Sequence, residues 1–414
     1  MAIPKLALIP SGVKAGKLYS VLPTNGDGDF TTTRNTVATR VNENGLIEEV
    51  AANVPRLDYS DGGCPSLLLE PQRTNSLLQS NQFDTTWSAT NTVLSSNQIG
   101  VGGSTDAWKL ESSSNSSETY LRQTTSLSGT SVLTLYAKKG NANFLGVYIG
   151  SSGADIIAYF DLNNGVVGNI SNTIETDIKS VGNDWYRCTI VGSNINQNVN
   201  FYVTDASGNF SSNDGSYIYI QYAQLEQGSY ATSYIKTVGT AQTRSADTAN
   251  GAGNASTFND SEGVLMMEIS SDNPLNDNRI YLSDGSDNNR IFIILDKSQS
   301  SIKGYVRGAA GYALAITSVG YDTSLNHKVL IKYKSNDYSF WINGFEVGSE
   351  TASTILPSGL NQLSFNGVGN YNPFYGNTKQ IQYFDSALND SDLEKLTSWT
   401  SFTAMANAQS YTII

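Results

Sequence analysis

Short runs of alternating apolar and polar residues, separated by clusters of Gly, Asn, Asp and Ser, recur along the whole 414-residue chain. Residues 132–137, 201–204 and 217–222 are such runs, rich in β-branched and aromatic side chains. Runs of this kind with turn signals between them predict an all-β sandwich or barrel. Helical periodicity is confined to residues 391–397, where acidic residues follow a capping residue, Asn389 or Ser391. We therefore expect an all-β protein with one short C-terminal helix.

The composition excludes several functional classes. Lys and Arg number 25 against 37 Asp and Glu, which gives a net charge of −12 and argues against nucleic-acid binding. One histidine, His327, and two cysteines are too few for the usual zinc sites or a disulfide scaffold, although a Cys64–Cys188 bond stays open. No apolar run reaches the ~18 residues of a membrane span, and the first residues lack the hydrophobic core of a signal peptide.

Differences in content along the chain predict five segments. Residues 1–80 hold six of the nine prolines and few sustained strand runs, so we expect this module to rely on neighbouring molecules for burial. Residues 81–239 and 261–400 are strand-rich and are expected to form one β-sandwich each. The polar residues 240–260 between them are typical of a linker. Residues 401–414 form a tail without a strong pattern.

Four short stretches of the N-terminal region carry a resemblance to a known family. They are VATRVN at residues 37–42, GLIE at 45–48, VPRLDY at 54–59 and LLLEPQRTN at 67–75. In this order they resemble a recurrent N-terminal module of bacteriophage tail-fibre and other virion proteins. The resemblance implies that residues 1–80 attach the protein to other virion proteins or mediate oligomerisation. It also implies assembly in the host cytoplasm and exposure on the particle surface.

The two strand-rich segments extend the resemblance. Residues 184–188 and 222–235 are similar to parts of a carbohydrate-binding-like jelly roll, which follows the module in that family. Residues 340–344 and 381–388 resemble a concanavalin A-like or laminin-G-like lectin sandwich. The family implies a homotrimer that adheres to carbohydrate on the host surface. Because single sugar contacts are weak, such adhesion needs many copies acting together.

Within the second sandwich, Trp341 and the loop around residue 373 are the candidate carbohydrate-binding residues. Alternation places Phe340 and Ile342 on the core face and Trp341 on the outer face, where an exposed indole would stack on a sugar ring. Packing of this indole against a neighbouring domain or subunit is the alternative. The loop contributes Tyr371, Asn372 and Tyr375, whose rings and amide suit sugar, although the same composition suits a buried contact.

A calcium site is the only cofactor for which the sequence offers candidates. Asp284 begins the segment DGSDNN between two strand-like runs, and oxygen ligands on a turn suit a hard cation. Asp and Gly at such a position also favour a hairpin turn without any metal. Because some laminin-G-like domains bind calcium on rim loops, Asp272 and Asp277 join Asp284 as candidate ligands.

Catalytic signatures are missing, so a non-enzymatic protein is expected. His327 is the only histidine available for a Ser-His-Asp relay, and no G-x-S-x-G motif supplies its nucleophile. Glu226 has no partner carboxylate at a fixed spacing. Asp and Glu are nevertheless numerous enough for the two carboxylates of a glycosidase, so a polysaccharide depolymerase stays open. The other alternative is a structural virion connector or decoration protein whose sandwiches bind no ligand.

Overall fold

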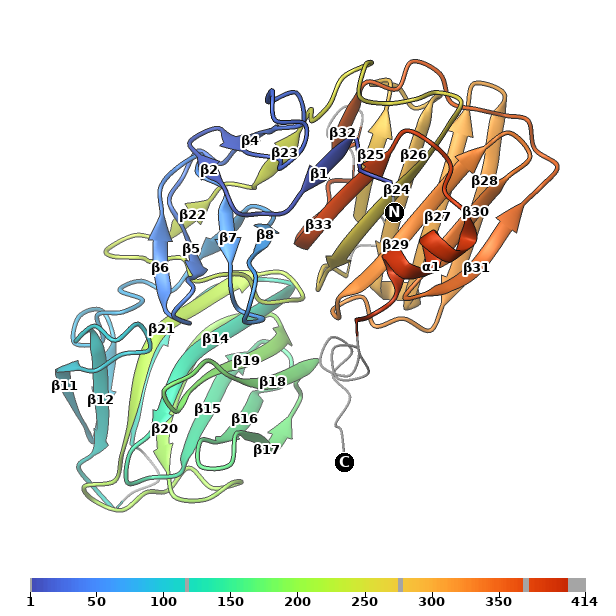
Figure 1. Ribbon diagram of the computed structural model, residues 1–414. Coiled ribbons are helices and arrows are strands. Elements are labelled where there is room, and N and C mark those ends of the chain that lie inside the picture. The colour runs from blue at the N-terminus through green and yellow to red at the C-terminus, as the bar shows by residue number, and fades with distance from the viewer. Residues whose placement is uncertain (1, 116–118, 275–277, 368–371, 401–414) are drawn as a thin grey trace. The chain divides into compact units, whose positions relative to one another are not determined.

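A computed structural model describes residues 2–115, 119–274, 278–367 and 372–400 of the chain. These residues form two compact units, each built mainly from strands (Figure 1). Unit 1 contains residues 1–35, 50–71 and 246–414, and unit 2 contains residues 36–49 and 72–245. Among the described residues, no helix combines the length and the apolar character that a membrane span requires. The expected all-β architecture is confirmed.

Unit 1 is a sandwich of two antiparallel sheets with a small third sheet. The large sheet has the order β31 (Phe345–Glu350), β30 (Tyr338–Ile342), β29 (His327–Lys334), β24 (Glu262–Ser270), β33 (Gly376–Phe384), β8 (Ser66–Leu69) and β7 (Arg56–Asp58), with β1 (Leu6–Leu8) also paired to β33. The five-stranded sheet has the order β28 (Gly311–Val319), β27 (Ser301–Gly308), β26 (Arg290–Asp296), β25 (Asn278–Ser283) and β32 (Gln362–Ser364), and a short 3₁₀ helix (Lys297–Gln299) follows β26. The small sheet has the order β2 (Val13–Lys14), β3 (Lys17–Leu18), β4 (Phe30–Thr33) and β23 (Thr248–Asn250).

Alternation along each strand divides its side chains between the core and the outer face. In β26, Ile291, Ile293 and Leu295 lie in the core between the two sheets, together with Ile331 of β29. Phe292 and the other intervening residues of β26 therefore point to the opposite, outer face of the five-stranded sheet.

The predicted helix is present as α1 (Asp390–Thr397) and lies on the outer face of the large sheet (Figure 1). The side chain of Asn389 caps its start by accepting a hydrogen bond from the Asp392 amide at 3.0 Å. Leu393 and Leu396 pack against apolar side chains of the sheet, so this face is covered rather than exposed to solvent.

Unit 2 contains a second sandwich, formed by two six-stranded antiparallel sheets around one apolar core. One sheet has the order β10 (Ser88–Thr90), β13 (Tyr120–Thr124), β20 (Ile195–Thr204), β15 (Phe144–Ser151), β16 (Ile156–Asp161) and β17 (Val166–Ser171). The other has the order β11 (Thr92–Gln98), β12 (Ala107–Ser112), β21 (Tyr217–Gln227), β14 (Thr130–Lys139), β19 (Trp185–Ser193) and β18 (Glu175–Ser180). Among the described residues there are also two separate strand pairs: β5 (Ala38–Val41) with β6 (Ile47–Val50), and β9 (Arg73–Asn75) with β22 (Gln242–Arg244).

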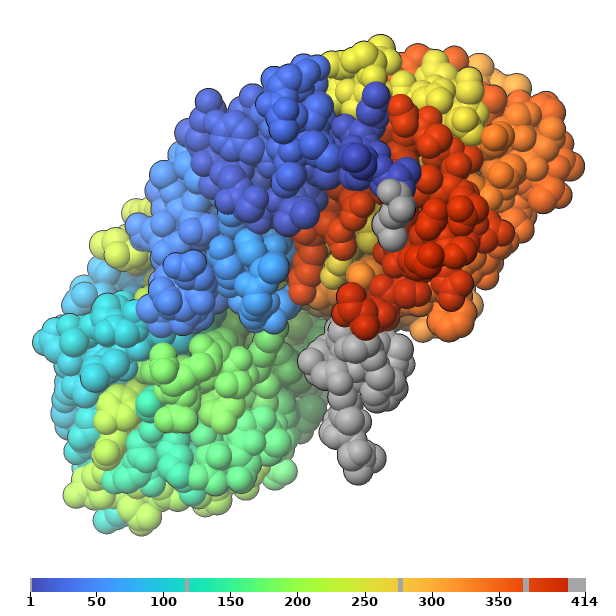
Figure 2. Space-filling model, viewed as in Figure 1, coloured from blue at the N-terminus to red at the C-terminus, as the bar shows by residue number. Residues whose placement is uncertain are grey.

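The N-terminal residues are distributed differently from the expected separate module of residues 1–80. They supply strands to sheets whose other strands come from distant parts of the chain: β1 and β8 pair with β33, and β4 pairs with β23. Figures 1 and 2 show the N-terminal residues beside the red strand β33. The expected linker of residues 240–260 likewise carries β22 and β23. The strands β1, β4, β8, β22 and β23 are only three or four residues long, which is why their alternation escapes detection in the sequence.

Candidate functional site

Trp341, the predicted sugar platform, is buried. The residue is 7% exposed and packs in an apolar cluster that includes Leu393 and Leu396 of α1. The indole Nε1 donates a hydrogen bond to Ser339 Oγ at 3.0 Å. The prediction that Trp341 points away from the inter-sheet core is confirmed, but the prediction that it is exposed is wrong, because the helix covers that face of the sheet.

The predicted aromatic loop is held against the sandwich. Tyr371 lies outside the described residues, whereas Asn372 and Tyr375 are both half-buried. The Tyr375 amide donates to Asn278 Oδ1 at 2.7 Å, and its carbonyl accepts from Ser271 Oγ at 2.5 Å. Backbone hydrogen bonds of Tyr375 therefore hold the loop against the sandwich. A role for Asn372 and Tyr375 in sugar binding stays a prediction.

The described calcium candidates, Asp272 and Asp284, are each engaged in other interactions. Asp277 lies outside the described residues, and Asp272 is exposed with Lys297 Nζ 3.6 Å away. Asp284 accepts hydrogen bonds from the Ser286 amide at 2.7 Å and from Asn289 Nδ2 at 2.9 Å, within the hairpin that joins β25 to β26. Partial burial tends to raise the pKa of Asp284, but these hydrogen bonds outweigh it and lower the pKa. Across the described ranges, no group of three His, Cys, Asp or Glu side chains is placed to hold a metal ion.

His327 occupies a structural position. Its Nδ1 accepts a hydrogen bond from Asn343 Nδ2 at 3.0 Å, and its Nε2 donates to the Asp322 carbonyl at 2.8 Å. Burial lowers the pKa of this imidazole, although the Asp322 carbonyl acts in the opposite direction. Both ring nitrogens of His327, at the start of the interior strand β29, are thus engaged in hydrogen bonds.

Glu226 and the two cysteines also occupy positions without a sign of a catalytic role. Glu226 is fully buried, and its carboxylate accepts from the Thr232 amide at 2.7 Å and hydroxyl at 2.6 Å. Arg73 Nε lies 3.7 Å from this carboxylate. Both cysteines are free thiols: Cys64 is exposed, and Cys188 lies in the core of unit 2.

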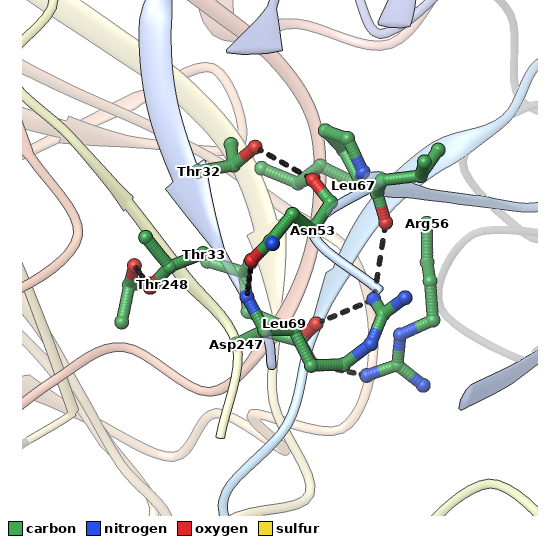
Figure 3. A pocket seen from close by; sticks show the side chains of 11 residues that line it. Thr32, Thr33, Asn53, Arg56, Leu67, Leu69, Asp247 and Thr248 are labelled. Carbon is green, nitrogen blue, oxygen red and sulfur yellow. Dashed lines mark hydrogen bonds and ion pairs between the residues drawn. The ribbon is translucent and has the colours of Figure 1, made fainter. Parts of the chain in front are cut away.

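A buried cluster of charged residues lies beside a cavity of about 10 Å³ in unit 1 (Figure 3). Asp247 accepts from Arg34 Nη1 at 3.0 Å, from the Glu70 amide at 3.0 Å and from Arg56 Nη2. Arg56 Nη1 also donates to Glu70 at 2.6 Å. A cavity of this volume holds at most about one water molecule, so the cluster is a structural feature rather than a ligand site. Arg56 and Glu70 belong to the stretches that carry the family resemblance, which therefore encode part of the fold.

Two larger hollows in unit 2, both lined by Tyr234, have volumes of about 430 and 190 Å³. Most polar groups along them already have protein partners. Thr39 Oγ1 donates to the Tyr234 carbonyl at 2.7 Å, and the Tyr234 hydroxyl lies 2.6 Å from Ser80 Oγ. The Tyr222 hydroxyl donates to Asp106 at 3.3 Å, and burial raises the pKa values of both tyrosines. Glu49 and Lys236, both exposed, also line the two hollows.

The outer face of the five-stranded sheet in unit 1 carries a row of four aromatic side chains that the sequence analysis did not single out. They are Tyr281 of β25, Phe292 of β26, Tyr305 of β27 and Tyr312 of β28. Strand register places Phe292 opposite both Tyr281 and Tyr305. Successive ring centroids are 5.5, 4.7 and 5.7 Å apart, and the first two pairs are stacked at 26° and 13°.

Arginine side chains lie over this row. The guanidinium of Arg290 is 4.7 Å from the centroid of Phe292, and that of Arg279 is 5.5 Å from the same ring. Arg307 lies 5.3 Å from the centroid of Tyr312. We call this surface the aromatic–arginine face; its members are Tyr281, Phe292, Tyr305, Tyr312, Arg279, Arg290, Lys303 and Arg307.

Two acidic residues pair with cations of this face. Asp287 forms an ion pair with Arg290, and Asp296 lies 2.7 Å from Lys303 Nζ. Burial tends to raise the pKa of Asp296, but hydrogen bonds from Lys303 and Ser298 outweigh it and lower the pKa. Within the described part of the chain, Arg307 has no carboxylate at ion-pair distance, so its charge is not neutralised locally.

The face is open at one end. Tyr281 and Phe292 are buried at 3% and 2% exposed, Tyr305 is half-buried, and Tyr312 on β28 is 48% exposed. A ligand would therefore meet the half-exposed Tyr312, the half-buried Tyr305 and the guanidinium of Arg307. An exposed aromatic ring can stack on the apolar side of a sugar, and a guanidinium donates hydrogen bonds to its oxygens.

The sequence contains a signal for this face. In each of β25, β26 and β27 a cation and an aromatic residue are two positions apart, as in Arg279–Tyr281, Arg290–Phe292 and Tyr305–Arg307. Residues two apart share a face of the strand, so the pattern indicates mixed aromatic and cationic outer positions. Only the pairing of the strands places them in one row.

Unit 2 carries a second aromatic row on the outer face of its β10–β17 sheet. Tyr120, Tyr202, Gly146 and Tyr159 follow one another across four strands in register. Because Gly146 has no side chain, it leaves a space in this row, and Phe210 from the loop after β20 occupies it. The Phe210 ring centroid is 4.3 Å from that of Tyr202 and 5.0 Å from that of Tyr159. Burial and the neighbouring Tyr202 raise the pKa of Tyr159 to about 12. The gap is thus occupied by a side chain of the same unit.

No family model and no curated protein sequence matches the chain. Among solved structures, it is similar to the CBM40 module of the Ruminococcus gnavus IT-sialidase bound to α2,3-sialyllactose, at 13% identity and a TM-score of 0.31, over 36% of this chain and 94% of that one. Domain 4 of AbnA, a GH43 extracellular arabinanase from Geobacillus stearothermophilus in complex with arabinotriose, matches at 11% identity and a TM-score of 0.30, over 42% and 84%. Domains LG4-5 of the mouse laminin α1 chain match at 9% identity and a TM-score of 0.25, over 76% and 94%. Likenesses at these levels assign neither a family nor a ligand to the chain.

Proposed function

We propose that this protein is a non-enzymatic bacteriophage virion protein, a tail fibre or capsid-attached fibre, that adheres to glycans on the host surface. The virion context is supported by the N-terminal stretches that resemble virion proteins. Adhesion is supported by one observation above all, the aromatic–arginine face with its exposed end at Tyr312 and Arg307.

The chemistry of this end suits a sugar ring. Tyr312 offers a half-exposed aromatic surface for stacking, and Arg307 offers planar N–H donors beside it. A contact of this size is weak, so useful adhesion requires several copies, in keeping with a homotrimer presented many times on a particle.

Binding of the full-length protein to purified host-surface polysaccharide tests the proposal. A Tyr305→Ala/Tyr312→Ala variant is expected to bind about tenfold or more weakly, since each lost aromatic contact is worth roughly 0.5–1.5 kcal/mol beyond the area that it buries. Phe345→Ala is the matched control, because Phe345 is 73% exposed on the other sheet of unit 1. Equal affinity of the two variants would show that the face is not the binding surface.

Two further measurements test the remaining parts of the proposal. Immunogold labelling of phage particles is expected to place the protein on the particle surface, and sedimentation equilibrium is expected to give a trimer. Incubation with polysaccharide should release no new reducing ends, whereas their appearance would favour a depolymerase. Absence of any binding at millimolar sugar would favour a structural connector.

A further inference from the structure

We infer that the glycan that binds the aromatic–arginine face is acidic, a polysaccharide whose sugar units carry carboxylates. This inference rests on the proposed function and adds the chemical class of its ligand. The first support is the distribution of charge. The chain carries a net charge of −12, yet four cations gather on this one sheet face; Asp287 pairs with Arg290 and Asp296 with Lys303, whereas Arg307 has no carboxylate at ion-pair distance among the described residues.

The second support is the position of Arg307. In strand register it lies directly opposite Arg290, so two positively charged residues occupy neighbouring positions on β26 and β27. Like charges at directly opposed positions repel one another, and an anion bound between them would relieve that repulsion. Asp287 reaches Arg290, whereas Arg307 has no such partner among the described residues.

The third support is hydrogen-bonding capacity. The Nε atoms of Arg290 and Arg307 are both buried, and neither has a hydrogen-bond acceptor in the described structure. Buried donors of this kind are uncommon, and each favours an incoming acceptor. A guanidinium that lies over an aromatic ring still presents its N–H edge, which matches the two oxygens of a carboxylate.

The geometry also discriminates between acidic polymers. Three of the four rings are stacked on one another or covered by guanidinium groups, which leaves no open slot for successive nucleic-acid bases. A sugar acid needs only one ring surface and a carboxylate partner, and Tyr312 with Arg307 supplies both. The face therefore favours an acidic polysaccharide over a polynucleotide.

The test compares the full-length protein on polygalacturonate, on its fully methyl-esterified form and on single-stranded DNA of similar length. We expect polygalacturonate to bind about tenfold or more tightly than the ester, because only its free carboxylates can form charge-assisted hydrogen bonds with the protein. Its affinity should also fall as the salt concentration is raised, because salt screens these charges. Arg307→Met should abolish this preference for the acid over the ester, and Arg307→Lys should restore part of it. Arg40→Met is the control for net charge, since Arg40 lies on the β5–β6 hairpin of unit 2 and pairs with Glu48.

The outcomes separate this inference from the proposed function. Equal binding of acid and ester, lost in the Tyr305→Ala/Tyr312→Ala variant, would overturn the acidic class and leave glycan adhesion standing. Equal effects of Arg307→Met and Arg40→Met would also overturn it. Binding of DNA as tight as that of polygalacturonate would reduce the face to a general polyanion surface. If none of the three polymers binds, the inference that the ligand is an acidic polysaccharide fails. The proposed adhesion to the host is tested separately, by the binding assay with purified host-surface polysaccharide.

Discussion

Asp247→Asn is expected to destabilise unit 1 strongly, because Asp247 compensates two buried arginines. Arg34 and Arg56 are 2% and 0% exposed, and both donate to the Asp247 carboxylate. Burial disfavours the charged form of Arg56, but Asp247 and Glu70 more than offset this and raise its pKa. The substitution keeps the size of the side chain and removes only its charge.

The magnitude follows from the burial of these groups. Removal of one partner from a buried ion pair costs about 3–5 kcal/mol, because the remaining charge is left uncompensated in a medium of low polarity. Asn also presents N–H groups toward arginine donors. With a urea dependence of about 1–3 kcal/mol per molar, the unfolding midpoint of unit 1 should fall by roughly 1–5 M.

Urea unfolding followed by hydrogen exchange and mass spectrometry measures this change in peptides of unit 1. Asp385→Asn is the matched control: it removes the same charge from an ion pair with Lys5 whose side chains are 46% and 52% exposed. An exposed pair is worth about 0–1 kcal/mol, so the control should shift the midpoint little. If the two variants lose equal stability, the buried cluster does not hold unit 1 together as argued.

Two other predictions follow from buried groups of unit 1. Trp341→Ala should lower the free energy of unfolding of unit 1 by about 3–5 kcal/mol, because it empties the apolar contact with α1. Helix α1 should detach first, seen as faster amide exchange in that helix, while glycan binding stays unchanged. Weaker glycan binding at unchanged stability would contradict the assignment of Trp341 to the packing under α1. The single histidine, His327, should titrate by proton NMR with a midpoint below the ordinary ~6.5, because burial lowers its pKa. The unfolded chain then takes up the proton first, so the stability from neutral His327 is present above about pH 6.5 and is lost as the pH falls below it; a midpoint at or above that value would refute the burial argument.

Local features of the chain were predicted correctly. The helix at Asp390–Thr397 follows from its capping residue and first-turn acids, and the Asp284 turn lies between β25 and β26 as turn chemistry indicates. The opposite facing of Phe340 and Trp341 follows from the two-residue period of a strand. The helix, the turn and the alternation each depend only on residues that are close together in the sequence.

Burial of Trp341 was not predictable in the same way. The two-residue period says which face a side chain occupies, but not what lies on that face. Leu393 and Leu396 are more than fifty positions away in the chain, and only the packing of α1 brings them over the indole. The same limit applied to the N-terminal residues, whose short strands are completed by β23 and β33.

The alternation within each strand, the turns, the C-terminal helix and the two-residue spacing of a cation and an aromatic residue on each of β25, β26 and β27 all follow from the amino-acid order. Which of these faces are covered, and which strands become neighbours, depends on how distant segments pack. The reason is physical: alternation arises from the geometry of one strand, whereas register and coverage arise from contacts between segments far apart in the chain. Tyr281, Phe292, Tyr305 and Tyr312 therefore became one surface only when four strands paired.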